Sequence, residues 1–162
     1  MKRFLCILLA LATLLTFAAC TSAKKYADDL SADKLNKSAI SSLADSVEYT
    51  TAADGFLDDY FTVPSYAKSV DIRFATDANN LNEFGVFQVE AGNAKAMETL
   101  LKDYLSKSYQ TNQAWYDSYI PAETPKLRDA EVKLFGNYAV YAIADTTTRT
   151  SFFEAIESQL TK

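Results

Sequence analysis

The chain has 162 residues, of which 49% are hydrophobic and 23% are charged, and its formal net charge is −5 at pH 7. This length and balance are typical of one folded domain with its own core rather than of a disordered chain. The acidic charge, with no basic run, argues against nucleic acid as a partner. The chain contains no histidine, which removes the commonest general base and the commonest metal ligand.

Residues 1–19 have the features of an export signal. Lys2 and Arg3 form a basic start, and the run from Phe4 to Ala19 is uncharged and mostly apolar. This run is shorter than the ~20 residues that a membrane-spanning helix needs. We therefore expect a cleaved signal peptide rather than a permanent anchor helix.

Cys20 follows the apolar run as the last residue of FAAC. An ordinary signal-peptidase cut before Cys20 would place the bulky Phe17 where a small residue is required. The motif resembles the lipobox of bacterial lipoproteins, although leucine is more usual than phenylalanine at its first place. The resemblance implies that Cys20 is acylated, becomes the first residue of the mature protein, and anchors it to the outer face of the cell membrane. The open alternative is an ordinary cut after Ala23, which would release a soluble protein.

This interpretation accounts for both cysteines. Cys6 lies in the segment that is removed, and Cys20 would be alkylated. No thiol then remains for a disulfide, a zinc site or a nucleophile. We expect no metal and no cofactor, and a fold that depends on its hydrophobic core alone.

The mature chain is expected to begin with a short polar tether, residues 20–31, followed by a single α+β domain, residues 32–162. Apolar residues at helical spacing predict a helix over residues 33–43. They also predict a second, short helix over residues 54–61, which ends before Pro64.

The pattern then changes to the alternation of a half-buried strand. Val70, Ile72 and Phe74 alternate with polar residues, and FGVFQVE at residues 84–90 predicts a second strand. The polar segment between them offers oxygen ligands for Ca²⁺. Asn82, however, stands at the sixth place, where an EF-hand loop needs glycine. We therefore expect a turn, which asparagines also favour.

Asn93 is the expected N-cap of the longest helix, whose apolar residues recur every three or four positions toward Trp115 and Tyr116. A loop containing Pro121 and Pro125 is expected to follow.

Residues 131–143 predict two further strands, joined at Gly136 and Asn137, which suit the two-residue turn of a hairpin. Ser151 and Glu154 form a capping box that predicts the start of a last helix. The expected order is therefore two N-terminal helices followed by ββαββα. This order favours a four-stranded, mostly antiparallel sheet with helices packed on one face.

Several segments resemble, in this order, a family of cell-envelope lipoproteins from low-GC Gram-positive bacteria. They are NEFGVFQVEAGN (residues 82–93), the long helix, YIP (residues 119–121) and KLFGNYAVYAI (residues 133–143). The likeness covers roughly residues 70–160, and the hairpin is its sharpest part. It implies a shared fold and location. The family is a domain of unknown function, so no catalytic residue is carried over.

The sequence offers little for catalysis. The acidic doublets Asp28–Asp29 and Asp58–Asp59 are poor catalytic pairs, because adjacent side chains on a helix point in different directions. Without histidine a Ser-His-Asp triad is impossible, and no phosphate-binding or dinucleotide-binding glycine motif occurs. We therefore name no catalytic residue.

A cluster of aromatic residues is the candidate binding surface: Tyr109, Trp115, Tyr116 and Tyr119. Such rings are enriched at interfaces and stack on sugars, although core packing is their commoner role. We expect a membrane-anchored, non-catalytic binding or scaffolding module for an envelope protein or a cell-wall glycan. The alternative is a hydrolase or transferase that acts on envelope polymers through carboxylates brought together by folding. A solute-binding transporter subunit ranks last, because one small domain lacks two closing lobes.

Overall fold

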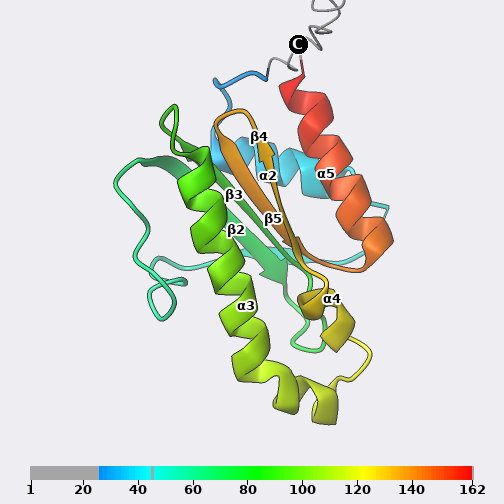
Figure 1. Cartoon of the computed structure of the whole chain (residues 1–162). Helices are drawn as coiled ribbons and strands as arrows, with labels where there is room; N and C mark the ends of the chain where they lie inside the picture. Colours follow the sequence, from blue (N-terminus) through cyan, green and yellow to red (C-terminus); the bar gives the residue numbers. More distant parts are fainter. Residues whose placement is uncertain (1–25, 45, 162) are drawn as a thin grey trace, which may run out of the picture.

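The computed structural model describes residues 26–44 and 46–161, which form an antiparallel sheet with helices against it (Figure 1). The strands of this sheet lie in the order β1-β2-β3-β5-β4. The bounds along the chain are α2 Ala32–Ser41, β1 Tyr49–Thr51, β2 Ala67–Ala75, β3 Glu83–Val89, α3 Ala94–Tyr119, α4 Thr124–Arg128, β4 Glu131–Phe135, β5 Tyr138–Ile143 and α5 Thr146–Leu160.

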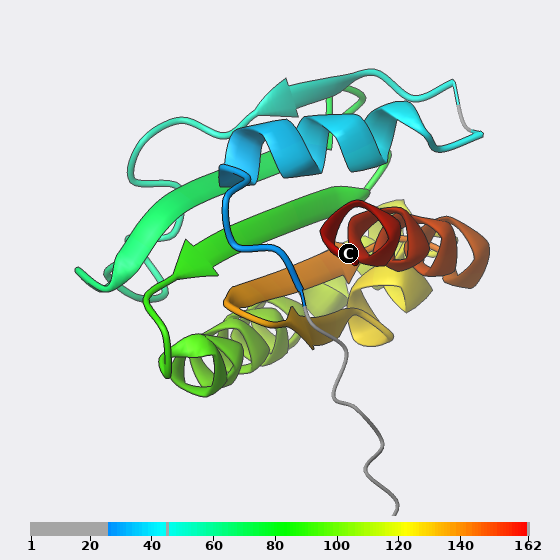
Figure 2. The same ribbon diagram turned by 90° about the horizontal axis from the view of Figure 1, so that it is seen from above.

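Helices cover both faces of the sheet, as Figure 2 shows from above, with α2 and α5 on one face and α3 and α4 on the other. The α+β class is confirmed, but the prediction that helices pack on one face is wrong. Every residue of β5 is buried, and successive side chains of a strand point to opposite faces. A strand that is apolar throughout needs a cover on both sides, so a second layer of helices is required.

The face under α2 and α5, here called the closed face, is filled by aromatic rings. Phe84 of β3 lies against Phe152 of α5 with ring centroids 4.3 Å apart, and Leu35 of α2 is fully buried in the same cluster. Asn36 is a buried polar residue here, and its amide donates to Asp71 Oδ2 at 2.9 Å and to the Phe84 carbonyl at 3.0 Å. These bonds satisfy a buried donor group and hold α2 across β2 and β3.

The opposite face, here called the α3 face, is built from the alternate residues of the same strands. Phe87 of β3 and Tyr141 of β5 are fully buried there with Met97 and Leu101 of α3. Tyr138, three residues before Tyr141, lies on the closed face. The sheet therefore separates two clusters of apolar side chains.

The sheet has five strands rather than the predicted four, because β1 adds an edge. Tyr49 pairs opposite Ala75 of β2, and two more residue pairs complete this short ladder. A strand of three residues, Tyr-Thr-Thr, is too short to show an alternating pattern. Its existence depends on the pairing partner that β2 supplies.

The predicted helix over residues 54–61 is wrong, because this segment forms a series of turns. Gly55 has a φ of 79°, which an α-helix excludes. The apolar residues that suggested a helix pack on the sheet instead. Phe56 stacks on Phe74 with ring centroids 5.8 Å apart, and Leu57 is buried.

Helix α5 begins earlier than the capping box predicted. It starts at Thr146, and the side chain of Asp145 caps it by accepting hydrogen bonds from two backbone N–H groups of the first turn. Ser151 and Glu154 therefore lie inside the helix. The short helix α4 also replaces part of the predicted loop, with Pro125 in its first turn, where a backbone N–H has no helical partner to lose.

The hairpin and the long helix are confirmed. β4 and β5 pair around Gly136 and Asn137, and Gly136 has a φ of 61°, as the first central residue of a type II′ turn requires. α3 begins after Asn93 and extends past Tyr116 to Tyr119.

The described chain begins with residues 26–31, which are bound to the domain. The ring of Tyr26 meets that of Phe135 edge-on at 5.8 Å. The backbone of Leu30 donates to the hydroxyl of Tyr138 at 3.2 Å, and that hydroxyl donates back to the Leu30 carbonyl at 2.7 Å. This end of the predicted tether is therefore packed on the sheet.

The predicted signal peptide, residues 1–19, and the predicted lipidation site, Cys20, lie outside the described residues. In the part of the chain that the structure describes, the helices are too short or too polar for any of them to cross a membrane.

Candidate functional site

The longest helix extends past the sheet. α3 has 26 residues and is about 39 Å long, whereas β3, one of the strands that it contacts, has 7 residues and spans about 24 Å. Residues seven apart share one side of a helix. Along this core-facing side the exposed fraction rises from 0% at Leu101 to 8% at Ser108 and 53% at Trp115. It rises likewise from 7% at Leu105 to 69% at Tyr119. The C-terminal part of the inward side of α3 therefore extends beyond the sheet.

Trp115 and Tyr119, here called the overhang pair, lie about one helical turn apart and contact each other. Their ring centroids are 5.0 Å apart and their planes are inclined by 30°. Tyr116 meets Trp115 edge-on with centroids 5.4 Å apart. Together these rings form a continuous aromatic surface, and such exposed surfaces are typical of interaction sites.

The structure divides the four predicted aromatic residues. Tyr109 and Tyr116 are half-buried and pack against the cluster of the α3 face, whereas Trp115 and Tyr119 are exposed. All four side chains are therefore at least partly exposed. The binding role of the surface itself stays a prediction.

The overhang pair lies far from the point where the described chain begins. Tyr26 bridges to Thr161 beside the end of α5, at one end of the domain. In Figure 1, the C-terminal end of α3 lies at the opposite end of the molecule. The overhang pair and the first described residue therefore lie at opposite ends of the domain.

A half-buried glutamate and two buried tyrosines form a polar cluster under α3, which the sequence reasoning missed. Glu83 Oε1 accepts hydrogen bonds from the hydroxyls of Tyr104 at 2.7 Å and Tyr141 at 2.5 Å. The ring of Tyr60 packs edge-on against that of Tyr104, with centroids 4.9 Å apart. The cluster ties β3, β5 and α3 together.

Gly85 makes this cluster sterically feasible. It lies opposite Tyr141 in the β3–β5 ladder, and a Cβ on Gly85 would stand 2.0 Å from Tyr141 Cε1. Without that atom the ring lies across β3 and its hydroxyl reaches Glu83, two residues along the same strand. The glycine inside the FGVF segment was the available signal, because such glycines mark close approaches.

The environment of Glu83 suits a structural role better than a catalytic one. Burial raises the pKa of its carboxyl group, although the hydrogen bonds from Tyr141 and Tyr104 act in the opposite direction. Burial and the neighbouring Glu83 charge raise the pKa of both tyrosines far above the usual range. Glu83 is absent from the lining of four surface hollows that the described residues form.

The polar segment considered for calcium forms a turn, as predicted. Asp77 accepts from the Asn79 N–H at 2.9 Å, and Asn80 accepts from the Asn82 N–H at 3.0 Å. These are local turn interactions that asparagine and aspartate commonly make. Across residues 26–44 and 46–161, no cluster of three or more acidic or cysteine side chains is arranged to hold a metal ion.

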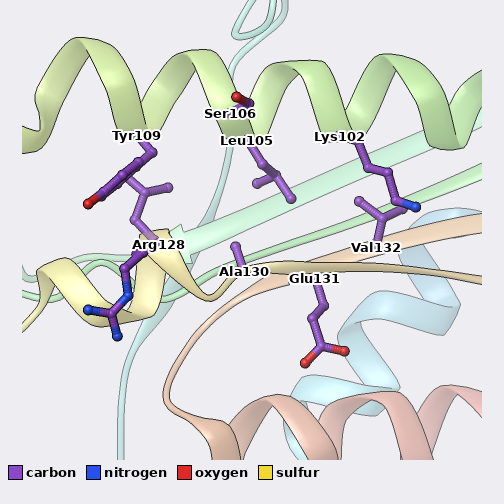
Figure 3. A pocket seen from close by; sticks show the side chains of 9 residues that line it. Lys102, Leu105, Ser106, Tyr109, Arg128, Ala130, Glu131 and Val132 are labelled. Carbon is purple, nitrogen blue, oxygen red and sulfur yellow. The ribbon is translucent and has the colours of Figure 1, made fainter.

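A groove of about 490 Å³ lies between α3 and the α4–β4 segment, and we call it the β4 groove (Figure 3). Tyr109 is the predicted aromatic residue that lines it. The groove has an apolar floor and a charged rim, and its lining residues are Lys102, Leu105, Ser106, Tyr109, Leu127, Arg128, Ala130, Glu131 and Val132.

Comparison of the chain with protein families, curated proteins and solved structures finds no match. Membership of the envelope lipoprotein family therefore stays a prediction.

Proposed function

We propose that this chain is a lipid-anchored extracytoplasmic lipoprotein whose domain binds an envelope partner, without catalysis, through the overhang pair. The observation that supports the binding role is the progression along one side of α3 from buried Leu101 to exposed Trp115. Large aromatic side chains left uncovered on a core-facing side are common energetic centres of interfaces.

An envelope protein is the partner that this geometry favours. The overhang pair continues the helical spacing of the residues through which α3 packs on its own domain. A partner surface that suits the pair is therefore one that packs against a helix. A cell-wall glycan is the second candidate, because the exposed faces of Trp115 and Tyr119 suit stacking on sugar rings.

The carboxylate-dependent enzyme remains the alternative and receives less support. Its requirement is two acids that converge in an open site. Glu83 is the described carboxyl group with a pKa raised by burial, and one of its oxygens accepts hydrogen bonds from two tyrosines.

The binding proposal is tested by site-specific cross-linking in cells. A photoreactive phenylalanine analogue at Ser118, beside the overhang pair, should give a discrete cross-linked product. The double variant Trp115→Ala/Tyr119→Ala should lose that product, whereas Gln113→Ala, on another side of α3, should retain it. An unchanged product in the double variant would contradict the proposal.

The glycan candidate has its own measurement. Purified cell-wall sacculi should sediment the wild-type chain and not the Trp115→Ala/Tyr119→Ala variant if a glycan is the partner. Sedimentation that does not depend on these two rings would remove the glycan from consideration and leave the protein partner.

The anchor is tested separately by metabolic labelling with an alkyne-tagged fatty acid. The wild-type chain should carry the label and partition into detergent, and Cys20→Ala should do neither. Equal labelling of both chains, or of neither, would show that Cys20 is not the lipid attachment site.

A further inference from the structure

β4 is an edge strand with an open side. It pairs only with β5 in the described sheet. Phe135 and Tyr138 flank the two-residue turn and form the closing hydrogen-bonded pair, and such pairs alternate along an antiparallel ladder. Val132 and Leu134 therefore turn their backbone N–H and C=O groups away from β5. These groups are available to a further strand.

The β4 groove lies beside this open edge, on the side of α3 (Figure 3). Leu105, Leu127 and Val132 form its apolar part, while Lys102 and Tyr109 project over it from α3. A strand laid along β4 would place every second side chain in this groove. Peptide recognition by strand addition uses this combination of unpaired backbone groups with pockets for alternate side chains.

Two of the three charged side chains that line the groove are cations, although the chain as a whole is acidic. Lys102 and Arg128 are 58% and 54% exposed, and they reach the rim from α3 and α4. Glu131 turns instead toward α5, where Arg149 binds it at 2.9 Å. Each rim cation already pairs with one neighbouring carboxylate. Lysine has three N–H donors and arginine five, so both can also bind a ligand.

We propose that the β4 groove binds an extended acidic peptide, which adds to β4 as a further strand. Its apolar side chains enter the groove, and its Asp or Glu side chains meet Lys102 and Arg128. Charge complementarity favours this occupant over a second copy of the chain, because two copies joined at β4 would bring like-charged rims together. The site is separate from the overhang pair and does not depend on the function proposed for it.

The test begins with a phage-displayed library of random nine-residue peptides, selected on the full chain in detergent. The selected peptides should have apolar residues at alternate positions and Asp or Glu between them. Binding of the strongest peptide should slow amide hydrogen exchange at Val132 and Leu134, whose N–H groups face outward in the free protein.

Two matched comparisons separate strand addition from attraction of charge alone. N-methylation of the peptide residues that face β4 should weaken binding about tenfold or more, and N-methylation of the intervening residues should change it less than about twofold. Lys102→Glu with Arg128→Glu should also weaken binding about tenfold or more. Lys107→Glu is the control, since Lys107 is a similarly exposed α3 lysine that pairs with Asp103 as Lys102 pairs with Glu98.

Several results would overturn the proposal. The library could yield no peptides or only basic ones. The two N-methylation patterns could weaken binding equally, or the bound peptide could leave amide exchange at Val132 and Leu134 unchanged. A dimer in solution that Val132→Pro dissociates would show instead that a second copy occupies the edge, because proline removes the outward N–H.

Discussion

The two faces of the sheet are made from alternate residues of the same strands, yet the proposed binding features lie on one of them. On the closed face, α2 and α5 lie over an aromatic cluster, and the buried amide of Asn36 donates within the domain. On the α3 face, a helix longer than the strands leaves both a groove and the overhang pair. The mismatch in length between helix and sheet therefore separates surfaces that stabilise the domain from surfaces that remain open.

The largest expected effect comes from the closed face. Phe84→Ala should lower the free energy of unfolding by about 3–5 kcal/mol, because it removes a fully buried ring and leaves a cavity against Phe152. Denaturation in urea measures this change. A loss below about 1 kcal/mol would show that the closed face is not the stabilising core.

Gly85→Ala tests the close packing on the α3 face. The added Cβ would clash with the Tyr141 ring, and a loss of about 1–3 kcal/mol is expected. The same substitution in a Tyr141→Ala background should be much less costly, because the ring is gone. If the loss in the double variant equals the sum of the losses in the two single variants, the ring and the glycine do not interact.

The pH dependence of stability should report on Glu83. Burial raises its pKa above the ordinary value of 4.5, so the folded domain holds this proton more tightly than the unfolded chain. Its contribution to the free energy of unfolding therefore falls as pH rises from 4.5 through the raised pKa. Glu83→Gln keeps an acceptor oxygen and does not ionise.

The stability of Glu83→Gln relative to wild type should consequently increase across that pH range and become constant above it. Urea denaturation at a series of pH values measures the difference. A difference that stays flat or decreases with pH would contradict the assignment, and the other carboxyl groups cancel because both proteins contain them.

The smallest effect is expected at the overhang. Trp115→Ala with Tyr119→Ala should change the free energy of unfolding by less than about 1 kcal/mol, because both side chains are largely exposed. The same double variant should lose the cross-linked partner. A large loss of stability would place these rings in the core of the domain and weaken their proposed role in binding.

Local patterns predicted the parts of the fold that local chemistry decides. Gly136 and Asn137 marked the hairpin because a two-residue turn constrains its own residues. The repeat along α3 predicted the helix for a similar reason. β1 was missed because its pairing with β2 is non-local. Residues 54–61 misled because Phe56 and Leu57 pack on a sheet that the sequence does not display.

The candidate sites show the same division. The aromatic residues could be found from the sequence, but the exposure of Trp115 depends on where the sheet ends beneath α3. The β4 groove brings Lys102 together with Arg128 and Val132, which are distant in sequence. No spacing rule links these residues, because tertiary packing alone makes them neighbours.

The attachment of residues 26–30 to the sheet shortens the segment that could separate the domain from a lipid anchor. If Cys20 carries lipid, residues 20–25 separate it from the first packed residue, and six residues span at most about 21 Å. A linker of this length would confine the domain to a layer beside the membrane. A partner held in that layer would meet it at a raised effective concentration, so a modest intrinsic affinity would suffice for binding in place.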